Sequence, residues 1–257
     1  MNTDPHPAIE VRNLKLSYDD YPVLHHINFK VNKGDIFIIM GGSGCGKSTL
    51  LKALTGLLEP LEGEVLYGDK NFWKANDARQ YAMMRNFGVL YQGGALWSSL
   101  TLWENVALPL QLHSKLSAAE IREMAELKLA LVGLRGYADF YPSEISGGMR
   151  KRAGLARAVA LDPDIIFFDE PSAGLDPVNA KMLDDLILEL RDIFDSTFVV
   201  VTHELASIFA IGNNAVFLDE ESKTMLAAGS PKDLLDNCRD QRVIQFLTRG
   251  EKKGAKQ

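Results

Sequence analysis

The eight residues GGSGCGKS, from Gly41 to Ser48, decide the fold of this chain. They match the pattern G-x-x-x-x-G-K-[ST], in which backbone N–H groups surround phosphates while the lysine and the hydroxyl serve phosphate and Mg²⁺. A continuous apolar run over residues 35–40 precedes them, and a helical pattern over residues 47–57 follows. A phosphate loop belongs between a buried strand and a helix, so this context favours a phosphate site over an ordinary tight turn.

Length and charge limit the classes of protein that the chain can belong to. Its 257 residues suit one large domain with an inserted subdomain, or two domains. A net charge of −6 argues against a surface built mainly for nucleic acid. Two cysteines, Cys45 and Cys238, supply no disulfide framework, which fits a reducing compartment. No stretch approaches the roughly 20 apolar residues of a membrane-spanning helix.

The order of hydrophobic periods predicts an α/β fold. Residues 8–16 and 27–31 alternate as antiparallel strands do, whereas apolar runs at 87–91, 165–169 and 197–202 favour buried parallel strands. Between them the period becomes helical. We therefore expect a P-loop NTPase core in residues 8–247 with a mixed, mainly parallel sheet, an N-terminal antiparallel β-subdomain, an inserted helical subdomain at about 94–161, and a polar, disordered tail at 248–257.

Two adjacent acids follow the apolar run 165–168. Asp169 at the end of such a strand is placed to hold Mg²⁺ through water, and Glu170 can polarise an attacking water as general base. A helix-capping acid pair is the alternative interpretation. Two further residues follow strands in the same way: Gln92 as a neutral ligand for Mg²⁺, and His203 as a donor to a phosphate oxygen or to the water.

A third element, Ser146-Gly147-Gly148, completes a set whose order resembles an ABC-transporter ATPase subunit. The resemblance covers about residues 8–235 and implies the ABC ATPase fold, ATP and Mg²⁺ as ligands, and a homodimer. The residues that carry it are Gly41 to Ser48, Gln92, Ser146-Gly147-Gly148-Met149, Asp169-Glu170, Ser172-Ala173-Gly174-Leu175-Asp176 and His203.

Site roles follow from this resemblance, residue by residue. It implies a catalytic pair, Glu170 and His203, and Mg²⁺ held by Ser48, Gln92 and Asp169. Nucleotide contacts would come from Tyr18 stacked on adenine, and from Gly41, Gly42, Ser43, Gly44, Cys45, Gly46, Lys47, Ser48, Thr49 and Gln92. The ATP of the partner subunit would be contacted by Ser146, Gly147, Gly148 and Asp176, in a head-to-tail dimer. For Tyr18, a core aromatic of a hairpin is the alternative.

A narrower resemblance concerns the kind of transporter. Met149 stands where many relatives carry glutamine, and with Arg150-Lys151-Arg152 it is similar to the subgroup that energises MCE-associated, Mla-type phospholipid transport between the inner and outer membranes. The stretches from Leu90 to Trp97 and from Arg242 to Leu247 resemble it too. The basic run itself we expect to be a solvated helix turn rather than a nucleic-acid or lipid patch.

The partners that this subgroup implies lie at the membrane. Leu96, Trp97, Leu100 and Trp103 would form the groove for a permease, unless these side chains only pack the helical subdomain. The chain would then be peripheral on the cytoplasmic face of the bacterial inner membrane, with an integral permease, a periplasmic MCE-domain protein and a small STAS-domain protein. Because the chain ends soon after Phe246, we expect a shortened contact with the STAS partner.

Two alternatives keep the same ATPase and change what it drives. One is the ATPase of a small-solute importer, for amino acids or similar cargo. The other is a soluble ABC ATPase that acts on nucleic acid, although such proteins tend to carry paired ATPase units, coiled-coil insertions or basic arms. A plain P-loop kinase is disfavoured, because it has no need of Ser146-Gly147-Gly148.

Overall fold

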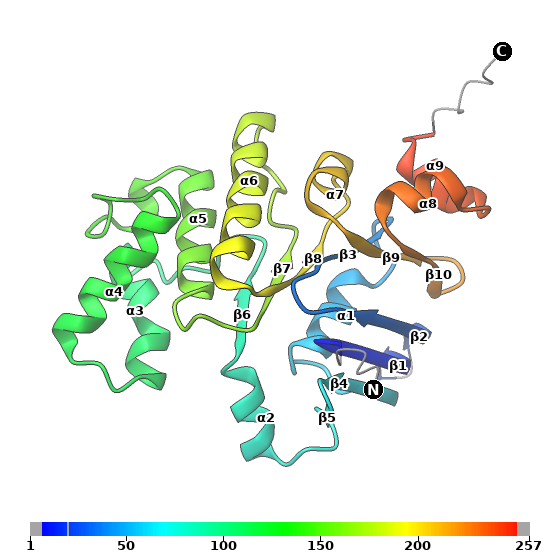
Figure 1. The fold of residues 1–257 in the computed structure, drawn as a ribbon, viewed down its shortest axis with the longest axis horizontal. Helices are drawn as coiled ribbons and strands as arrows, with labels where there is room; N and C mark the ends of the chain where they lie inside the picture. The colour runs from blue at the N-terminus through cyan, green and yellow to red at the C-terminus, as the bar shows by residue number, and fades with distance from the viewer. Residues whose placement is uncertain (1–6, 20, 251–257) are drawn as a thin grey trace, which may run out of the picture. The chain divides into compact units, whose positions relative to one another are not determined.

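The computed structural model describes residues 7–19 and 21–250, and these fall into two compact units. The first unit runs up to Gln80 and resumes at Val199, and the second is Tyr81–Phe198. Figure 1 shows the order of the elements along the chain. The helical subdomain expected at 94–161 lies within the second unit, and the expected tail lies largely beyond Gly250, outside the described residues.

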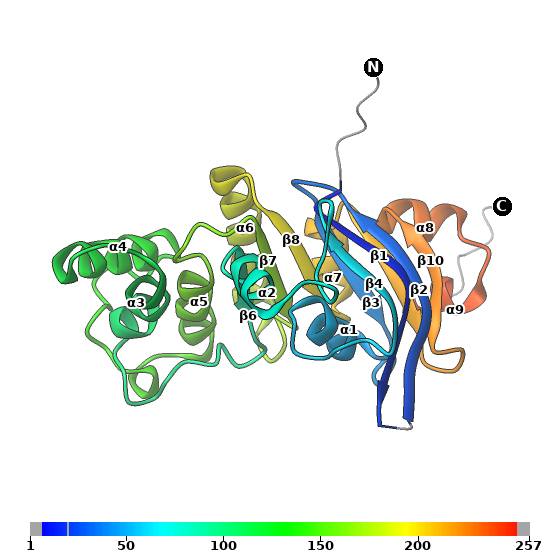
Figure 2. The ribbon, with the colours of Figure 1, turned by 90° about the horizontal axis from the view of Figure 1, so that it is seen from below.

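The first unit contains the expected antiparallel sheet, in the order β2-β1-β4-β5. Its strands are β1 (Ile9–Tyr18), β2 (Tyr21–Val31) and β4 (Glu62–Tyr67), labelled in Figure 2, and the short β5 (Lys70–Asn71). β2 begins earlier than the alternating pattern at 27–31 predicts, because Tyr21 and Pro22 already belong to it and pair with Tyr18 and Ser17. Proline, which has no N–H to donate, is tolerated there at the end of a strand.

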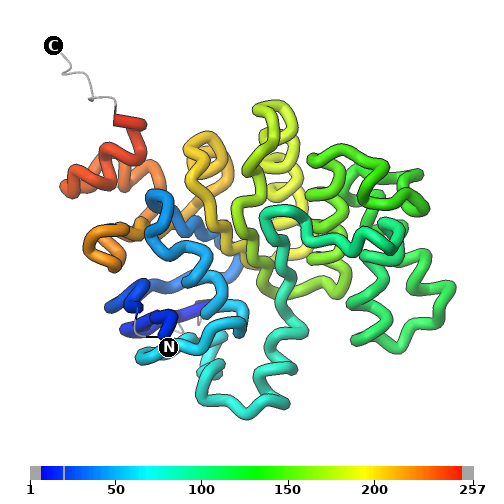
Figure 3. Tube along the Cα trace, turned by 180° about the vertical axis from the view of Figure 1, so that it is seen from behind, coloured from blue at the N-terminus to red at the C-terminus, as the bar shows by residue number. Residues whose placement is uncertain are grey.

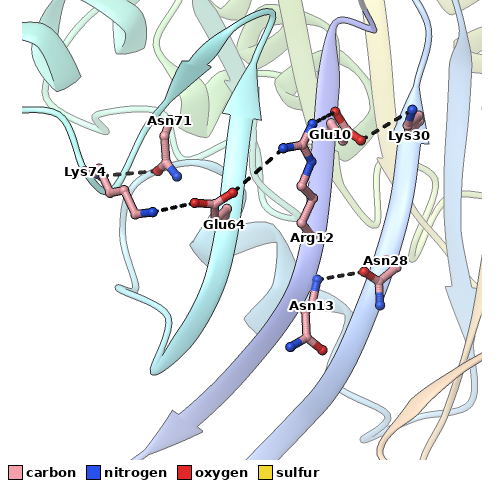
Figure 4. Close-up of polar contacts among 8 residues, drawn as sticks. All are labelled: Glu10, Arg12, Asn13, Asn28, Lys30, Glu64, Asn71 and Lys74. Atoms are coloured by element: carbon pink, nitrogen blue, oxygen red, sulfur yellow. Dashed lines mark hydrogen bonds and ion pairs between the residues drawn. The ribbon is translucent and has the colours of Figure 1, made fainter.

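The two faces of this sheet differ in chemistry. Ile9 and Val11 of β1 are buried, while charged side chains on the other face form a ladder across three strands (Figure 4). Arg12 lies 2.7 Å from Glu10 and 3.9 Å from Glu64. The hydrogen bond from Arg12 lowers the pKa of Glu10 below its usual value. Such exposed pairs are screened by solvent and contribute little stability, so the apolar face holds the sheet in place.

The same unit carries the strands that precede the candidate site. These strands lie in the order β10-β9-β3-β8. They are the antiparallel β10 (Thr224–Gly229), β9 (Asn214–Asp219), β3 (Ile36–Gly41) and β8 (Thr197–Val201). β8 belongs to this unit from Val199 onward. All six residues of β3 are buried, and β3 runs parallel to β9. Its helices are α1 (Lys47–Leu54), α7 (Leu205–Ile211), α8 (Pro231–Asn237) and α9 (Gln241–Leu247).

The second unit joins two parallel strands, β6 (Phe87–Leu90) and β7 (Ile165–Asp169), to a group of helices (Figure 3). The helices are α3 (Leu102–His113), α4 (Ala118–Leu131), the short η1 (Pro142–Glu144), α5 (Gly147–Ala158) and α6 (Pro177–Phe194), while α2 (Asp77–Met84) bridges the two units along the chain. Capping boxes at Thr101 and Ser117 begin α3 and α4. Nowhere in residues 7–19 and 21–250 does a helix have the length and apolarity needed to span a membrane.

One buried side chain organises the loop that precedes α3. Asn105 is fully buried, and its Oδ1 accepts a hydrogen bond from the Trp97 backbone N–H at 2.7 Å. Its Nδ2 lies within 3.1 Å of the carbonyl oxygens of Trp97, Leu100 and Thr101. One buried amide therefore ties together the backbone of Trp97, Leu100 and Thr101.

Replacing Asn105 with leucine should lower the free energy of unfolding by about 2 to 3 kcal/mol, because the loop loses its partners in a buried place. Urea unfolding followed by circular dichroism measures the change. The same substitution at the exposed Gln111, also on α3, serves as control and should shift stability by less than about 0.5 kcal/mol. Equal effects in the two variants would contradict the role of Asn105.

Candidate functional site

The phosphate loop of the first unit requires glycine at its two ends. Gly41 closes β3 at φ 152°, and an added Cβ would lie 2.3 Å from the carbonyl oxygen of Leu218. Gly46 precedes α1 at φ 94°, where a Cβ would lie 2.9 Å from Leu24. Only glycine fits such close approaches at positive φ. The loop can therefore reverse the chain from strand to helix in a few residues.

Lys47 lies across this loop. It is only 8% exposed, and its Nζ donates to the carbonyl oxygens of Gly41 at 3.0 Å and Gly42 at 2.8 Å. Gly42, Ser43, Gly44 and Ser48 are exposed beside it. The N–H groups at the start of α1 add partial positive charge. A buried ammonium ion beside these solvent-exposed loop residues is suited to bind a phosphate.

Cys45 is the buried thiol of the loop, 2% exposed. Burial raises the pKa of Cys45, and the neighbouring Lys47 partly opposes this shift. The side chain therefore stays a neutral thiol near pH 7, and both Cys45 and Cys238 are free cysteines. Cys45 packs the inside of the loop rather than facing a ligand through its side chain.

Tyr18 lies at the end of β1 in the same unit as the loop. Its side chain is 43% exposed, and its hydroxyl is 3.2 Å from Nζ of Lys52 on α1. Such exposure disfavours the interpretation of Tyr18 as a core aromatic. Nζ of Lys52 lies over the ring, 5.6 Å from its centroid, and the exposed part of the ring is available to stack on a base.

His203 follows β8 and lies beside the phosphate loop. The N–H of the preceding Thr202 donates to the carbonyl oxygen of Ile39, two residues before Gly41. His203 and Gly42 line one cavity of about 670 Å³, which Glu220 also lines. The structure thus places His203 and Gly42 of the loop at one cavity. Sequence reasoning missed Glu220, which the register Gly41↔Leu218 places at the same edge of the sheet.

The second unit places Gln92 and the acid pair at one sheet edge. Leu90 of β6 pairs with Phe168 of β7, and the strands are parallel, so Gln92 and Asp169 both follow at the carboxyl end. Glu170 adopts φ 49°, in the left-handed region that non-glycine residues rarely occupy. Strained backbone of this kind clusters at functional sites.

The serine–glycine element forms the beginning of α5. Ser146 caps the helix, with its Oγ accepting from the Met149 N–H at 3.2 Å, and both Ser146 and Gly147 are exposed. Asp176 caps α6 in the same way, accepting from the N–H groups of Val178 and Asn179 at 3.1 Å. A hydrogen bond from Asn179 lowers the pKa of Asp176. Both helix ends therefore present polar groups to solvent.

The basic run after Met149 differs from expectation. Lys151 is buried, Arg150 donates to the carbonyl oxygen of Ile145 at 2.9 Å, and Arg152 donates to that of Val132 at 3.2 Å. The interpretation of a solvated helix turn is therefore wrong. The charges face backbone carbonyl groups of neighbouring segments, which a reading of charge along one helix cannot reveal.

The four candidate docking residues have different surroundings. Trp97 is 63% exposed, whereas Leu96 and Leu100 are half-buried. The ring of Trp103 lies under the guanidinium of Arg122, 4.5 Å from its centroid. Trp97 is thus open to a partner, while Trp103 also packs within the helical group.

A family model described as ABC transporter matches residues 24–173, more than half of the chain. The chain belongs to the ABC transporter family. The family resemblance seen in the motifs is confirmed, and this ABC ATPase couples ATP hydrolysis to transport as a subunit of a transport system.

Curated relatives match almost the whole chain. The intermembrane phospholipid transport system ATP-binding protein MlaF of Haemophilus influenzae is 40% identical over 96% of this chain and 92% of its own length. MlaF of Escherichia coli K12 is 39% identical over 93% and 88%. A probable ribonucleotide transport ATP-binding protein, mkl of Mycobacterium leprae, is 40% identical over 93% of this chain but 68% of its own length.

Solved structures confirm the predicted fold. CbiO1 from Clostridium perfringens, part of the ABC transporter complex cbiONQ, superposes with a TM-score of 0.82 at 25% identity, covering 95% of each chain. The ATP-binding cassette MJ0796, in a dimeric post-hydrolysis state with ADP and Pi, has a TM-score of 0.78 at 29% identity over 86% of this chain and 98% of its own.

The predicted Mg²⁺ donors suit that ion chemically. Ser48, Gln92 and Asp169 offer hydroxyl, amide and carboxylate oxygens, and Mg²⁺ takes few protein ligands beside water and substrate phosphate. Across the part of the chain that the structure describes, no three His, Cys, Asp or Glu side chains gather into a metal cluster. The expected donors are of the kind that serve an ion arriving with a nucleotide.

Replacing Lys47 with alanine should reduce ATP turnover by at least about 100-fold, because the loop loses its one buried ammonium ion. Phosphate release measured at saturating MgATP tests this. The exposed Lys70 of β5, changed to alanine, is the matched control and should keep normal turnover. Full activity in the Lys47 variant would refute the assignment of the phosphate loop.

Proposed function

We propose that this ABC ATPase drives phospholipid transport between the inner and outer membranes of a Gram-negative envelope. The near full-length match to MlaF carries the proposal, since 96% of this chain aligns with 92% of that protein. The ribonucleotide relatives reach the same identity, but about a third of their length lies outside the match. Met149, which stands where many relatives carry glutamine, agrees with the lipid cargo.

The proposed chemistry is assigned residue by residue. Tyr18 stacks on adenine, while Gly41 to Thr49 bind the phosphates, with Lys47 neutralising their charge. When bound, Mg²⁺ would be held by Ser48, Gln92 and Asp169 and would neutralise charge on the phosphates. Glu170 takes a proton from the attacking water, and His203 donates to a γ-phosphate oxygen.

Two copies of the chain make the complete machine in this proposal. Ser146, Gly147 and Gly148, with Asp176, contact the ATP held by the partner subunit. An exposed helix N-terminus with a serine hydroxyl is a ready anion site, so ATP joins the two subunits. Hydrolysis removes part of that bridge and lets the subunits separate, which converts chemistry into movement.

The motion is delivered to a membrane partner. We propose that an integral permease docks beside Leu96, Trp97, Leu100 and Trp103 and holds the chain on the cytoplasmic face of the inner membrane. A periplasmic MCE-domain protein and a small STAS-domain protein would belong to the same complex. The exposed indole of Trp97 is the best-placed anchor, because aromatic side chains contribute much of the energy at interfaces.

Replacing Trp97 with alanine should abolish the response of ATPase rate to the permease while leaving the rate of the isolated subunit within about twofold. Turnover with and without the permease complex in detergent measures both. The control is Leu112→Ala, at a residue of α3 that is 74% exposed. Loss of the response in both variants, or in neither, would contradict a specific docking role.

A transport assay with the reconstituted complex identifies the cargo. The complex should be purified from membranes, reconstituted in vesicles with labelled phospholipid, and supplied with MgATP. We expect ATP-dependent lipid movement, lost with Glu170→Gln, which should also trap an ATP-bound dimer. Co-purification of a solute permease, or ATP-driven uptake of ribonucleotides without lipid movement, would overturn the lipid proposal and leave the ATPase assignment intact.

A further inference from the structure

Lys151 is a buried lysine within the second unit. It lies on α5, five residues after Ser146, and only 7% of it is exposed. Its Nζ donates to two backbone carbonyl oxygens, that of Pro171 at 2.6 Å and that of Ala173. Burial lowers the pKa of Lys151, and the Glu170 carboxylate opposes this shift. A charged group so placed needs its partners, since burying it alone is costly.

The carbonyl groups that Lys151 binds belong to the loop between β7 and α6. This loop begins directly after Glu170, whose carbonyl oxygen accepts from the Ala173 N–H at 3.2 Å. It ends at Asp176, just after a second turn in which the Leu175 N–H donates to the Ser172 carbonyl at 3.1 Å. The two turns leave the Pro171 and Ala173 carbonyl groups directed at one ammonium ion.

A second contact ties the start of α5 to the same loop. A Cβ added at Gly148 would lie 3.4 Å from Oδ1 of Asn179 and 3.8 Å from Leu175. Asn179 in turn donates to the carboxylate of Asp176. Gly148 of α5 therefore lies close to Leu175 of the loop and to Asn179 of α6, in addition to the two hydrogen bonds of Lys151.

We propose that Lys151 is a positioning residue that holds Glu170 and Asp176 in place relative to Ser146, Gly147 and Gly148. The inference rests on the proposed hydrolysis site and head-to-tail dimer. Glu170 acts on the ATP of its own subunit, while Ser146, Gly147 and Gly148 touch the ATP of the partner. A single ammonium ion thus connects the residues that serve the two ATP molecules.

The effect of removing this connection is specific. Both hydrogen bonds of Lys151 given above go to the loop after β7, and the phosphate loop and Tyr18 are separate segments of the chain, so ATP binding should persist. Glu170, however, would lose support on a strained backbone, and small displacements of a catalytic group slow the reaction strongly. A lysine with a merely structural role would lower stability without separating these two properties.

The experiment compares Lys151→Met with Lys128→Met in the purified full chain. Lys128 is the matched control: it is 2% exposed in the same unit, forms an ion pair with Asp162 and lies 4.6 Å from the ring of Phe194. We expect Lys151→Met to lower kcat about tenfold or more while KM for ATP changes less than about threefold. Lys128→Met should lose comparable stability in urea and keep kcat within about twofold.

Two further variants keep the test decisive. Lys151→Arg, which can still donate to both carbonyl groups, should recover kcat to within about threefold of the original chain. If Lys151→Met does not fold, Lys151→Gln takes its place with the same expected loss of kcat. Unchanged kcat in the Met or Gln variant, or an equal loss in Lys128→Met, would overturn the inference.

The outcome is separable from that of the proposed function. The assay contains neither lipid nor permease, so a different cargo leaves it unaffected. Full turnover in Glu170→Gln would refute the proposed hydrolysis site and this inference with it. Full turnover in the Lys151 variants alone would refute only the role of Lys151.

Discussion

The carboxyl ends of buried parallel strands are the constraint on which this structure depends. β3 is buried along its whole length, and at Gly41 the chain must leave the sheet within contact of the Leu218 carbonyl. Only a glycine-rich loop can do so and still begin a helix at Lys47. The loop geometry, the burial of Lys47 and the exposure of Ser48 all follow from that exit.

The same constraint acts in the second unit with different chemistry. β6 and β7 end side by side, so Gln92 and Asp169 follow at one edge without any local signal linking them. Glu170 leaves the strand in a left-handed conformation, and the loop beyond it is held by Lys151. Buried lysine side chains thus fix both loops: Lys47 binds carbonyl groups of its own loop, and Lys151 binds those of a distant one.

Much of the fold was predictable because its signals are local. β7 has the predicted bounds, and the capping boxes that begin α3 and α4 each involve residues only three apart in the sequence. β4 was not predicted, since its short strand is defined by pairing with β1, about 50 residues earlier in the chain. The family was also accessible from motif order, and the comparisons confirm it. Roles of individual site residues stay predictions for the experiments above.

The sequence by itself determined the phosphate loop, the acid pair and the serine–glycine element, because each is a short motif whose chemistry lies in its own residues. Tertiary structure decided what depends on contact between distant segments. It opened Tyr18 to solvent, placed His203 beside Gly42, packed Trp103 under Arg122, and buried Lys151 against the loop after β7. Burial and hydrogen-bond partners arise only when separate segments pack together, so a pattern along one chain segment does not contain them.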